Sequence, residues 1–145
     1  MTVSSTVTPD EVAQITWDAV VIGAGPAGCI TARELALSGC SVLLLEAKRF
    51  PRHKVCGGCV NHHAVALLRQ CGLESLFTEA GAVPITEFRI QLPDWNPHYQ
   101  LPAGWSITRA TMDSQLVAKA IESGVHYLDE AIGKLDDDIA DDFRT

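Results

Sequence analysis

The sequence contains no lysine or arginine before Arg33, and no apolar run precedes residue 18. A secretory signal joins a basic start to an apolar stretch, so we expect no export signal. The longest stretch without a charged residue, 19–32, is too short to span a bilayer. These absences predict a cytoplasmic protein with no transmembrane segment. Its five cysteines are then expected to be reduced thiols rather than a disulfide framework.

Positive charge is also scarce, because the net charge is −7 over 145 residues. A chain this acidic is a poor candidate for binding nucleic acid. Four of the bases nevertheless lie close together within residues 48–54. Such a basic loop favours a phosphorylated small molecule as ligand. The sequence shows no internal repeat.

It also shows no Ser/His/Asp arrangement and no paired carboxylates that would indicate a hydrolytic site. Its length allows one domain with a hydrophobic core.

Residues 17–46 show the pattern of a strand, a glycine-rich turn, a helix and a second strand that ends in a carboxylate. We expect the strands at 17–22 and 41–46 and the helix at 26–38. Glu46 follows the last glycine of the turn by 18 positions, close to the offset of about 20 residues at which an acid meets ribose hydroxyls. This is the βαβ pattern that binds the pyrophosphate and ribose of a dinucleotide.

The residues of the turn have separate physical roles. Gly23 allows a tight turn out of the strand, Gly25 lets the backbone approach a diphosphate, and Gly28 lets the helix pack near the sheet. Pro26 suits the first helical turn, where its missing N–H costs nothing. We predict that this turn, with Ala27, faces the diphosphate through free N–H groups at the positive end of the helix.

The rest of the chain departs from a plain repetition of strand and helix. We expect a loop at 50–60, two helices at 61–80, antiparallel strands within 84–109, a helix capped by Thr111, and a third parallel strand from about residue 125. The predicted class is α/β, a Rossmann-like FAD-binding βαβ unit with a parallel sheet and an inserted antiparallel β segment. A nicotinamide-binding domain would instead continue directly with further αβ units.

The expected domain organisation has three parts. Residues 1–14 form a flexible tail, 15–135 form the FAD-binding domain with its insertion at about 61–109, and 136–145 form an acidic tail.

The chain resembles the FAD-dependent oxidoreductases of the geranylgeranyl reductase type, within the aromatic hydroxylase-like flavoproteins. The residues that carry the resemblance are Gly23-Ala24-Gly25-Pro26-Ala27-Gly28, Ala32, Glu46, Pro51-Arg52-His53-Lys54-Val55-Cys56-Gly57-Gly58 and Thr108-Arg109-Ala110-Thr111-Met112-Asp113 with Leu116. They extend over roughly residues 17–128, and the second segment is the most specific of them.

The resemblance implies FAD as cofactor and a role for each matching position. Glu46, with the adjacent Ala47, would bind the ribose of the AMP half, and Arg109 would contact the diphosphate region. Arg52, Lys54 and the loop of Cys56, Gly57 and Gly58 would lie along the cofactor toward the isoalloxazine.

The resemblance also implies flavin-mediated hydride transfer to an apolar isoprenoid or aromatic substrate, or monooxygenase-like chemistry, with NAD(P)H or another compound as electron donor. The oligomeric state is left open. Members of this family are much longer, and their Gly-Asp segment has no counterpart here. We therefore expect a fragment, a truncated product or a minimal relative. The alternatives are a non-catalytic nucleotide-binding remnant and an NAD(P)-binding module.

The cysteines and aromatic residues allow further interpretations. Cys56 and Cys59 form a CxxC pair, so Cys56 is a candidate catalytic redox thiol, against the simpler reading of two thiols without function. The same cysteines with His53, His62 and His63 could hold zinc, although structural zinc sites normally take a second ligand pair from a distant segment. The other cysteines, Cys29, Cys40 and Cys71, read as buried apolar residues, and Trp95, Tyr99 and Trp105 as sheet packing or an apolar ligand surface.

Overall fold

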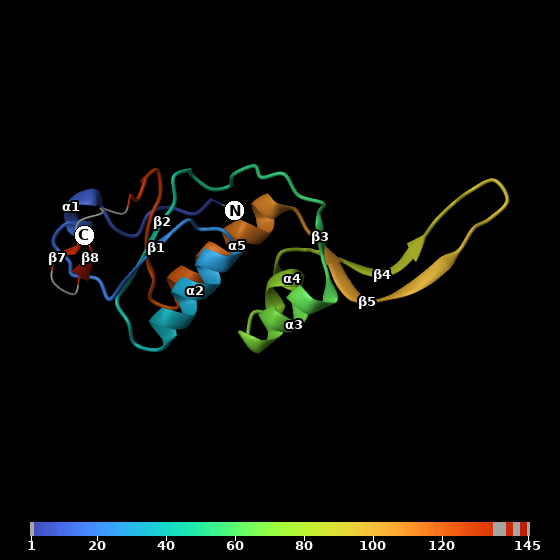
Figure 1. Ribbon diagram of the computed structural model, residues 1–145, viewed down its shortest axis with the longest axis horizontal. Coiled ribbons are helices and arrows are strands. Elements are labelled where there is room, and N and C mark those ends of the chain that lie inside the picture. The colour runs from blue at the N-terminus through green and yellow to red at the C-terminus, as the bar shows by residue number, and fades with distance from the viewer. Residues whose placement is uncertain (1, 135–138, 141–142, 145) are drawn as a thin grey trace. The chain divides into compact units, whose positions relative to one another are not determined.

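The computed structural model describes residues 2–134, 139–140 and 143–144. The chain divides into two compact units (Figure 1). We call the first the parallel-sheet unit; it contains residues 2–50 and the chain from Val117 onward. The second, the antiparallel-sheet unit, contains residues 51–116.

The parallel-sheet unit contains the predicted βαβ pattern. Its elements are α1 (Pro9–Val12), β1 (Ala19–Ile22), α2 (Pro26–Leu37), β2 (Val42–Leu45) and β6 (His126–Leu128). The strands form one sheet in the order β1-β2-β6, and both pairings are parallel. Because β2 is central, β1 and β6 hold it in register from both sides, with Val21 opposite Leu44 and Leu44 opposite Tyr127.

Burial explains why these segments form this unit. Val42, Leu43 and Leu44 are all buried, as expected for a parallel strand that is covered on both faces. Helix α2 buries the small residues Cys29 and Ala32, which allow a helix to lie close to a sheet. The core of the unit is therefore built around the central strand.

The N-terminal segment differs from the loose tail that the sequence suggested. Val3 and Val7 are buried, and Val3 forms an isolated antiparallel bridge with Phe50. The backbone N–H of Thr6 donates to the carbonyl oxygen of Tyr127 at 2.8 Å. Thr8 begins α1 with a capping box. The segment is therefore held by two buried apolar side chains and a capped turn. Its Ser/Thr-rich composition did not predict these contacts.

The antiparallel-sheet unit contains the predicted insertion. Its elements are β3 (Cys59–Val60), α3 (His62–Gln70), α4 (Ser75–Glu79), β4 (Val83–Arg89), β5 (His98–Ser106) and the start of α5 (Arg109–Glu122). The strands pair antiparallel in the order β3-β5-β4. Asn61 caps α3 by accepting a hydrogen bond from the N–H of Ala64, as expected.

The predicted fold class is confirmed, with local corrections to the boundaries. The loop at 50–60 ends in β3, and the third parallel strand stops at Leu128. The side chain of Thr108, not that of Thr111, accepts the N–H at the start of α5, so the cap lies three residues earlier than predicted. Within the tail predicted at 136–145, β7 (Ile139–Ala140) and β8 (Phe143–Arg144) pair antiparallel, and its other residues lie outside the described part. No helix in the described ranges has the length and apolar character that a membrane crossing requires.

We predict that Asp18 makes the stability of the fold depend on acid pH. Its carboxylate accepts hydrogen bonds from the backbone N–H and the hydroxyl of Ser41, at 2.7 and 2.8 Å, and these hydrogen bonds lower the pKa of Asp18 below its ordinary 3.8. A lowered folded-state pKa stabilises the fold above the ordinary pKa, and this stabilisation is lost as pH falls through the folded value. Asp18→Asn should therefore lower the melting temperature at neutral pH but not at a pH below the folded pKa.

The measurement is thermal unfolding of both proteins by circular dichroism across that pH range. Asp94→Asn is the matched control, because it removes the same charge from an exposed position. A difference between D18N and the wild type that stays constant at every pH would contradict the prediction.

Candidate functional site

The glycine turn brings α2 unusually close to β1. Gly23 follows β1 with a φ of +102°, a conformation that favours glycine. A Cβ atom built on Gly28 would lie 2.0 Å from the carbonyl oxygen of Gly23, a distance that no side chain tolerates. Gly28 is therefore required for the close packing of helix and turn, as the sequence predicted.

The start of α2 presents backbone N–H groups without competition from side chains. Gly25 is the N-cap and makes no side-chain capping hydrogen bond, and Pro26 is the first helical residue. The first turn carries no acidic residue. An anion can therefore accept hydrogen bonds from the free N–H groups at the positive end of the helix dipole.

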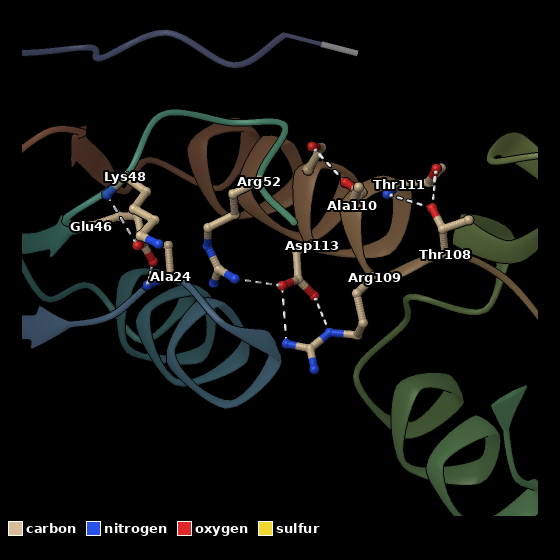
Figure 2. A network of polar contacts seen from close by, with 10 residues as sticks. Ala24, Glu46, Lys48, Arg52, Thr108, Arg109, Ala110, Thr111 and Asp113 are labelled. Carbon is tan, nitrogen blue, oxygen red and sulfur yellow. Dashed lines mark hydrogen bonds and ion pairs between the residues drawn. The ribbon is translucent and has the colours of Figure 1, made fainter. Parts of the chain in front are cut away.

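Glu46 directs its carboxylate at the same turn (Figure 2). Its Oε2 accepts the backbone N–H of Ala24 at 3.0 Å, and its Oε1 accepts the N–H of Lys48 at 3.2 Å. The backbone of Glu46 is held as well, because its N–H donates to the carbonyl of Leu128 and its own carbonyl accepts the N–H of Ala131. Each carboxylate oxygen can accept more than one hydrogen bond, so Glu46 is still able to accept hydroxyl donors. This arrangement fits the diphosphate and ribose of a dinucleotide.

A charged cluster in the antiparallel-sheet unit surrounds Asp113, which is fully buried. Arg109 donates from Nε and Nη2 to the two carboxylate oxygens, at 2.8 and 3.0 Å, four residues apart on α5. The guanidinium of Arg52, itself 5% exposed, lies 3.3 Å from Oδ2 of Asp113 (Figure 2). The hydrogen bonds from Arg109 to Asp113 are the main reason why the pKa of Arg109 is raised. The cluster keeps a net charge of +1 with one acid between two bases.

Arg109 also lines a cavity of about 370 Å³ within the same unit. Its other lining residues are His53, Lys54, Cys56, Gly58, Thr108 and Ala110. The Sγ of Cys56 accepts the N–H of Gly58 at 3.2 Å, and Cys56 is exposed. The cavity thus combines three basic side chains with a thiol and includes no acidic residue.

The structure groups the predicted site residues by unit. The turn from Gly23 to Gly28 and Glu46 come together in the parallel-sheet unit, where Ala27 and Ala47 are exposed. Lys54, Cys56 and Arg109 line one cavity of the antiparallel-sheet unit, whereas Arg52 is not among its lining residues and joins Arg109 through Asp113. Gly57 is exposed in the same loop. The role of Asp113 was missed, although the i,i+4 spacing from Arg109 is a signal for such a pair.

A disulfide between Cys56 and Cys59 and a zinc site receive no support from the described residues. All five cysteines are free, so Cys56 and Cys59 form no disulfide. No group of three or more metal-ligating side chains occurs in the described ranges, which removes the basis for zinc. Cys29 is buried as expected, but Cys40 and Cys71 are only half-buried.

The three aromatic residues were expected either to pack on the sheet or to form an apolar ligand surface, and they differ in burial. Trp105 stacks on Phe77 with ring centroids 5.4 Å apart, which supports its role in packing. Trp95 and Tyr99 are 57% and 49% exposed.

Comparison with known proteins identifies the domain. A family model of the FAD binding domain matches residues 16–125. The menaquinone reductase of Mycobacterium tuberculosis is 48% identical over 116 residues, which are 77% of this chain and 28% of that protein. Digeranylgeranylglycerophospholipid reductase 2 of Methanopyrus kandleri is 34% identical over 110 residues, 74% of this chain and 26% of that protein. The crystallised flavin-dependent brominase Bmp2 has a TM-score of 0.66 at 30% identity, over 86% of this chain and 31% of its own.

The chain belongs to the FAD-binding domain family of flavin-dependent oxidoreductases and monooxygenases, and the predicted cofactor, FAD, is confirmed. The narrower assignment to the geranylgeranyl reductase type is not established, because a brominase lies among the similar proteins. The chain spans less than a third of the length of these relatives.

We predict that Gly28→Ala disrupts the turn and weakens FAD binding at least tenfold. The added methyl group must displace the carbonyl of Gly23, and overpacking of this kind costs about 1–3 kcal/mol. FAD titration followed by flavin fluorescence measures the affinity, and circular dichroism measures the fold. Thr31→Ala, at an exposed position of the same helix, should leave both unchanged. Wild-type affinity in G28A would disprove the role of the close approach.

Proposed function

We propose that this chain is the FAD-binding part of an oxidoreductase that reduces a carbon–carbon double bond of an isoprenoid compound. The observation that carries the proposal is the glycine turn with Glu46 directed at it, together with the family match over residues 16–125. FAD, when bound, supplies the hydride chemistry, and the protein supplies binding and orientation.

The residues of the parallel-sheet unit are assigned to the AMP half of the cofactor. The N–H groups at the start of α2 would bind the diphosphate, because they are uncapped and lie at the positive end of a helix. Glu46 would accept hydroxyl donors from the ribose. Ala47, Ala27 and Pro26 are assigned to the surface beside these groups.

The residues of the antiparallel-sheet unit are assigned to the remaining polar groups of the ligand. Arg109 and Lys54 carry positive charge into one cavity, which suits phosphoryl oxygens. Arg52 would act on the same cluster through Asp113. Cys56 and Gly57 stay candidates for contact near the reactive end of the flavin, and Cys56 is exposed as a reactive thiol would need to be.

The substrate class is inferred from two relatives. The names of the menaquinone reductase and the digeranylgeranylglycerophospholipid reductase refer to compounds with isoprenoid chains, and these two proteins are 48% and 34% identical to this chain. An apolar isoprenoid is therefore the proposed substrate, with NAD(P)H as the proposed electron donor and the cytoplasm as the proposed location. Halogenation is the second candidate, because the brominase structure is similar over 86% of the chain.

The test combines reconstitution with product analysis. The purified chain is incubated with FAD, and a bound flavin absorption band is expected after removal of free cofactor. The holoprotein is then given NADPH and a menaquinone. After any quinol is reoxidised to the quinone, mass spectrometry should detect the gain of two hydrogen atoms in the isoprenoid chain. In a parallel assay with NADPH, molecular oxygen as the oxidant, bromide and a pyrrole, formation of a brominated pyrrole would favour the halogenase alternative. Bound FAD without turnover of either substrate would favour a nucleotide-binding remnant.

We predict that Glu46 distinguishes ribose from deoxyribose. The wild-type chain should bind ADP more tightly than 2′-deoxy-ADP, because the deoxy compound lacks one hydroxyl donor for the carboxylate. Glu46→Gln should weaken ADP binding about tenfold, the range for a hydrogen bond to a charged group, and should abolish the preference. Isothermal titration calorimetry of both nucleotides measures the effect. Glu34→Gln, an exposed change on α2, is the control, and equal preference in E46Q and wild type would refute the assignment.

A further inference from the structure

Asp113 has a place in the molecule that no catalytic or cofactor assignment explains. It is fully buried and lies on the first turns of α5, where two guanidinium groups contact its carboxylate. A buried carboxylate is costly unless it is paired and hydrogen-bonded. Here both oxygens accept from Arg109, at 2.8 and 3.0 Å, and Arg52 adds an ion pair at 3.3 Å.

The fork of hydrogen bonds fixes the orientation of Arg109. Asp113 engages Nε and Nη2, and Figure 2 shows the third guanidinium nitrogen turned away from the carboxylate. A guanidinium is planar and rigid, so fixing two nitrogens also fixes the third. Arg109 is at the same time part of the lining of the 370 Å³ cavity.

The chemistry of that cavity selects an anion. His53, Lys54 and Arg109 line it with no acidic residue among the lining residues, and Thr108 adds a hydroxyl. Arginine in a fixed geometry matches the oxygens of phosphate, and lysine adds a point charge. We propose that Asp113 is a positioning residue that holds Arg109 in place, so that this cavity binds a phosphoryl group. The inference rests on the proposed function, which assigns this cavity to phosphoryl oxygens, and it adds the residue that orients Arg109.

A positioning role and simple electrostatics predict opposite signs for one substitution. Asp113→Asn removes a negative charge near the cavity, so Coulomb attraction alone would make an anion bind more tightly. If Asp113 instead holds the guanidinium in place, its loss frees Arg109 and binding becomes weaker. The sign of the change therefore separates the two explanations.

The experiment measures binding of inorganic pyrophosphate to the full chain by calorimetry at low salt. We expect D113N to bind about tenfold more weakly than wild type, the effect of losing one charge-assisted, bidentate contact. Asp113→Glu should recover part of the affinity, because it restores a carboxylate. Asp94→Asn, which removes the same charge from an exposed position, should bind pyrophosphate as the wild type does.

Several outcomes would overturn the proposal. These are no binding of pyrophosphate to the wild type, or equal or tighter binding to D113N with an unchanged circular dichroism spectrum. If D113N does not fold, Arg109→Lys replaces it, because lysine keeps the charge but lacks the fork. A tenfold loss in R109K supports the proposal, and unchanged affinity overturns it.

The same proteins show whether the phosphoryl group belongs to FAD or to another phosphorylated ligand. If the group belongs to FAD, the loss in D113N should appear with FAD and ADP but not with riboflavin, which has no phosphate. If it belongs to another phosphorylated ligand, pyrophosphate should still bind to the chain saturated with FAD. Pyrophosphate binding without FAD binding would reject the proposed function and keep this inference, whereas FAD binding without pyrophosphate binding would do the reverse.

Discussion

The close approach of α2 to the turn that follows β1 is the constraint on which the nucleotide site depends. Gly28 lies where a single methyl group would meet the carbonyl oxygen of Gly23 at 2.0 Å. This packing places the uncapped N–H groups of the first helical turn beside the end of β1. A larger residue would move the helix, and the donors would then no longer converge on one anion. The proposed binding of a diphosphate at this turn therefore requires a residue without a side chain at position 28.

The sheet fixes the position of Glu46, the residue that we propose to bind the ribose. The residue follows β2, and β2 is paired on one side with β1 and on the other with β6. The N–H of Glu46 donates to the carbonyl of Leu128, the last residue of β6. Strand β6 therefore helps to fix the position of Glu46, which follows β2. The side chain then accepts from Ala24 in the turn. Backbone pairing and a side-chain hydrogen bond thus link the acid to the donors of the helix.

Local sequence predicted the features that local chemistry determines. The turn, the helix and the carboxylate lie within thirty residues, and glycine spacing with apolar periodicity is enough to identify them. The ordering of the segment with Val3 and Thr6 was not predicted, because their partners, Phe50 and Tyr127, are distant in sequence. The link between Arg52 and Asp113 was missed for the same reason. The pair of Arg109 and Asp113 was missed as well, although it is local and the i,i+4 spacing could have predicted it.

The two units handle charge in different ways, which bears on how one domain serves several enzymes. The parallel-sheet unit uses backbone dipoles and one buried acid, Glu46, groups that suit a constant nucleotide. The antiparallel-sheet unit uses cationic side chains, and the carboxylate of Asp113 accepts two hydrogen bonds from one of them, Arg109. Neither set of residues is assigned to substrate binding. The similarity to both a reductase and a brominase shows that proteins with different printed activities share a segment of this kind. The β4–β5 hairpin adds exposed aromatic residues, Trp95 and Tyr99, whose side chains are not needed for the packing of the described core.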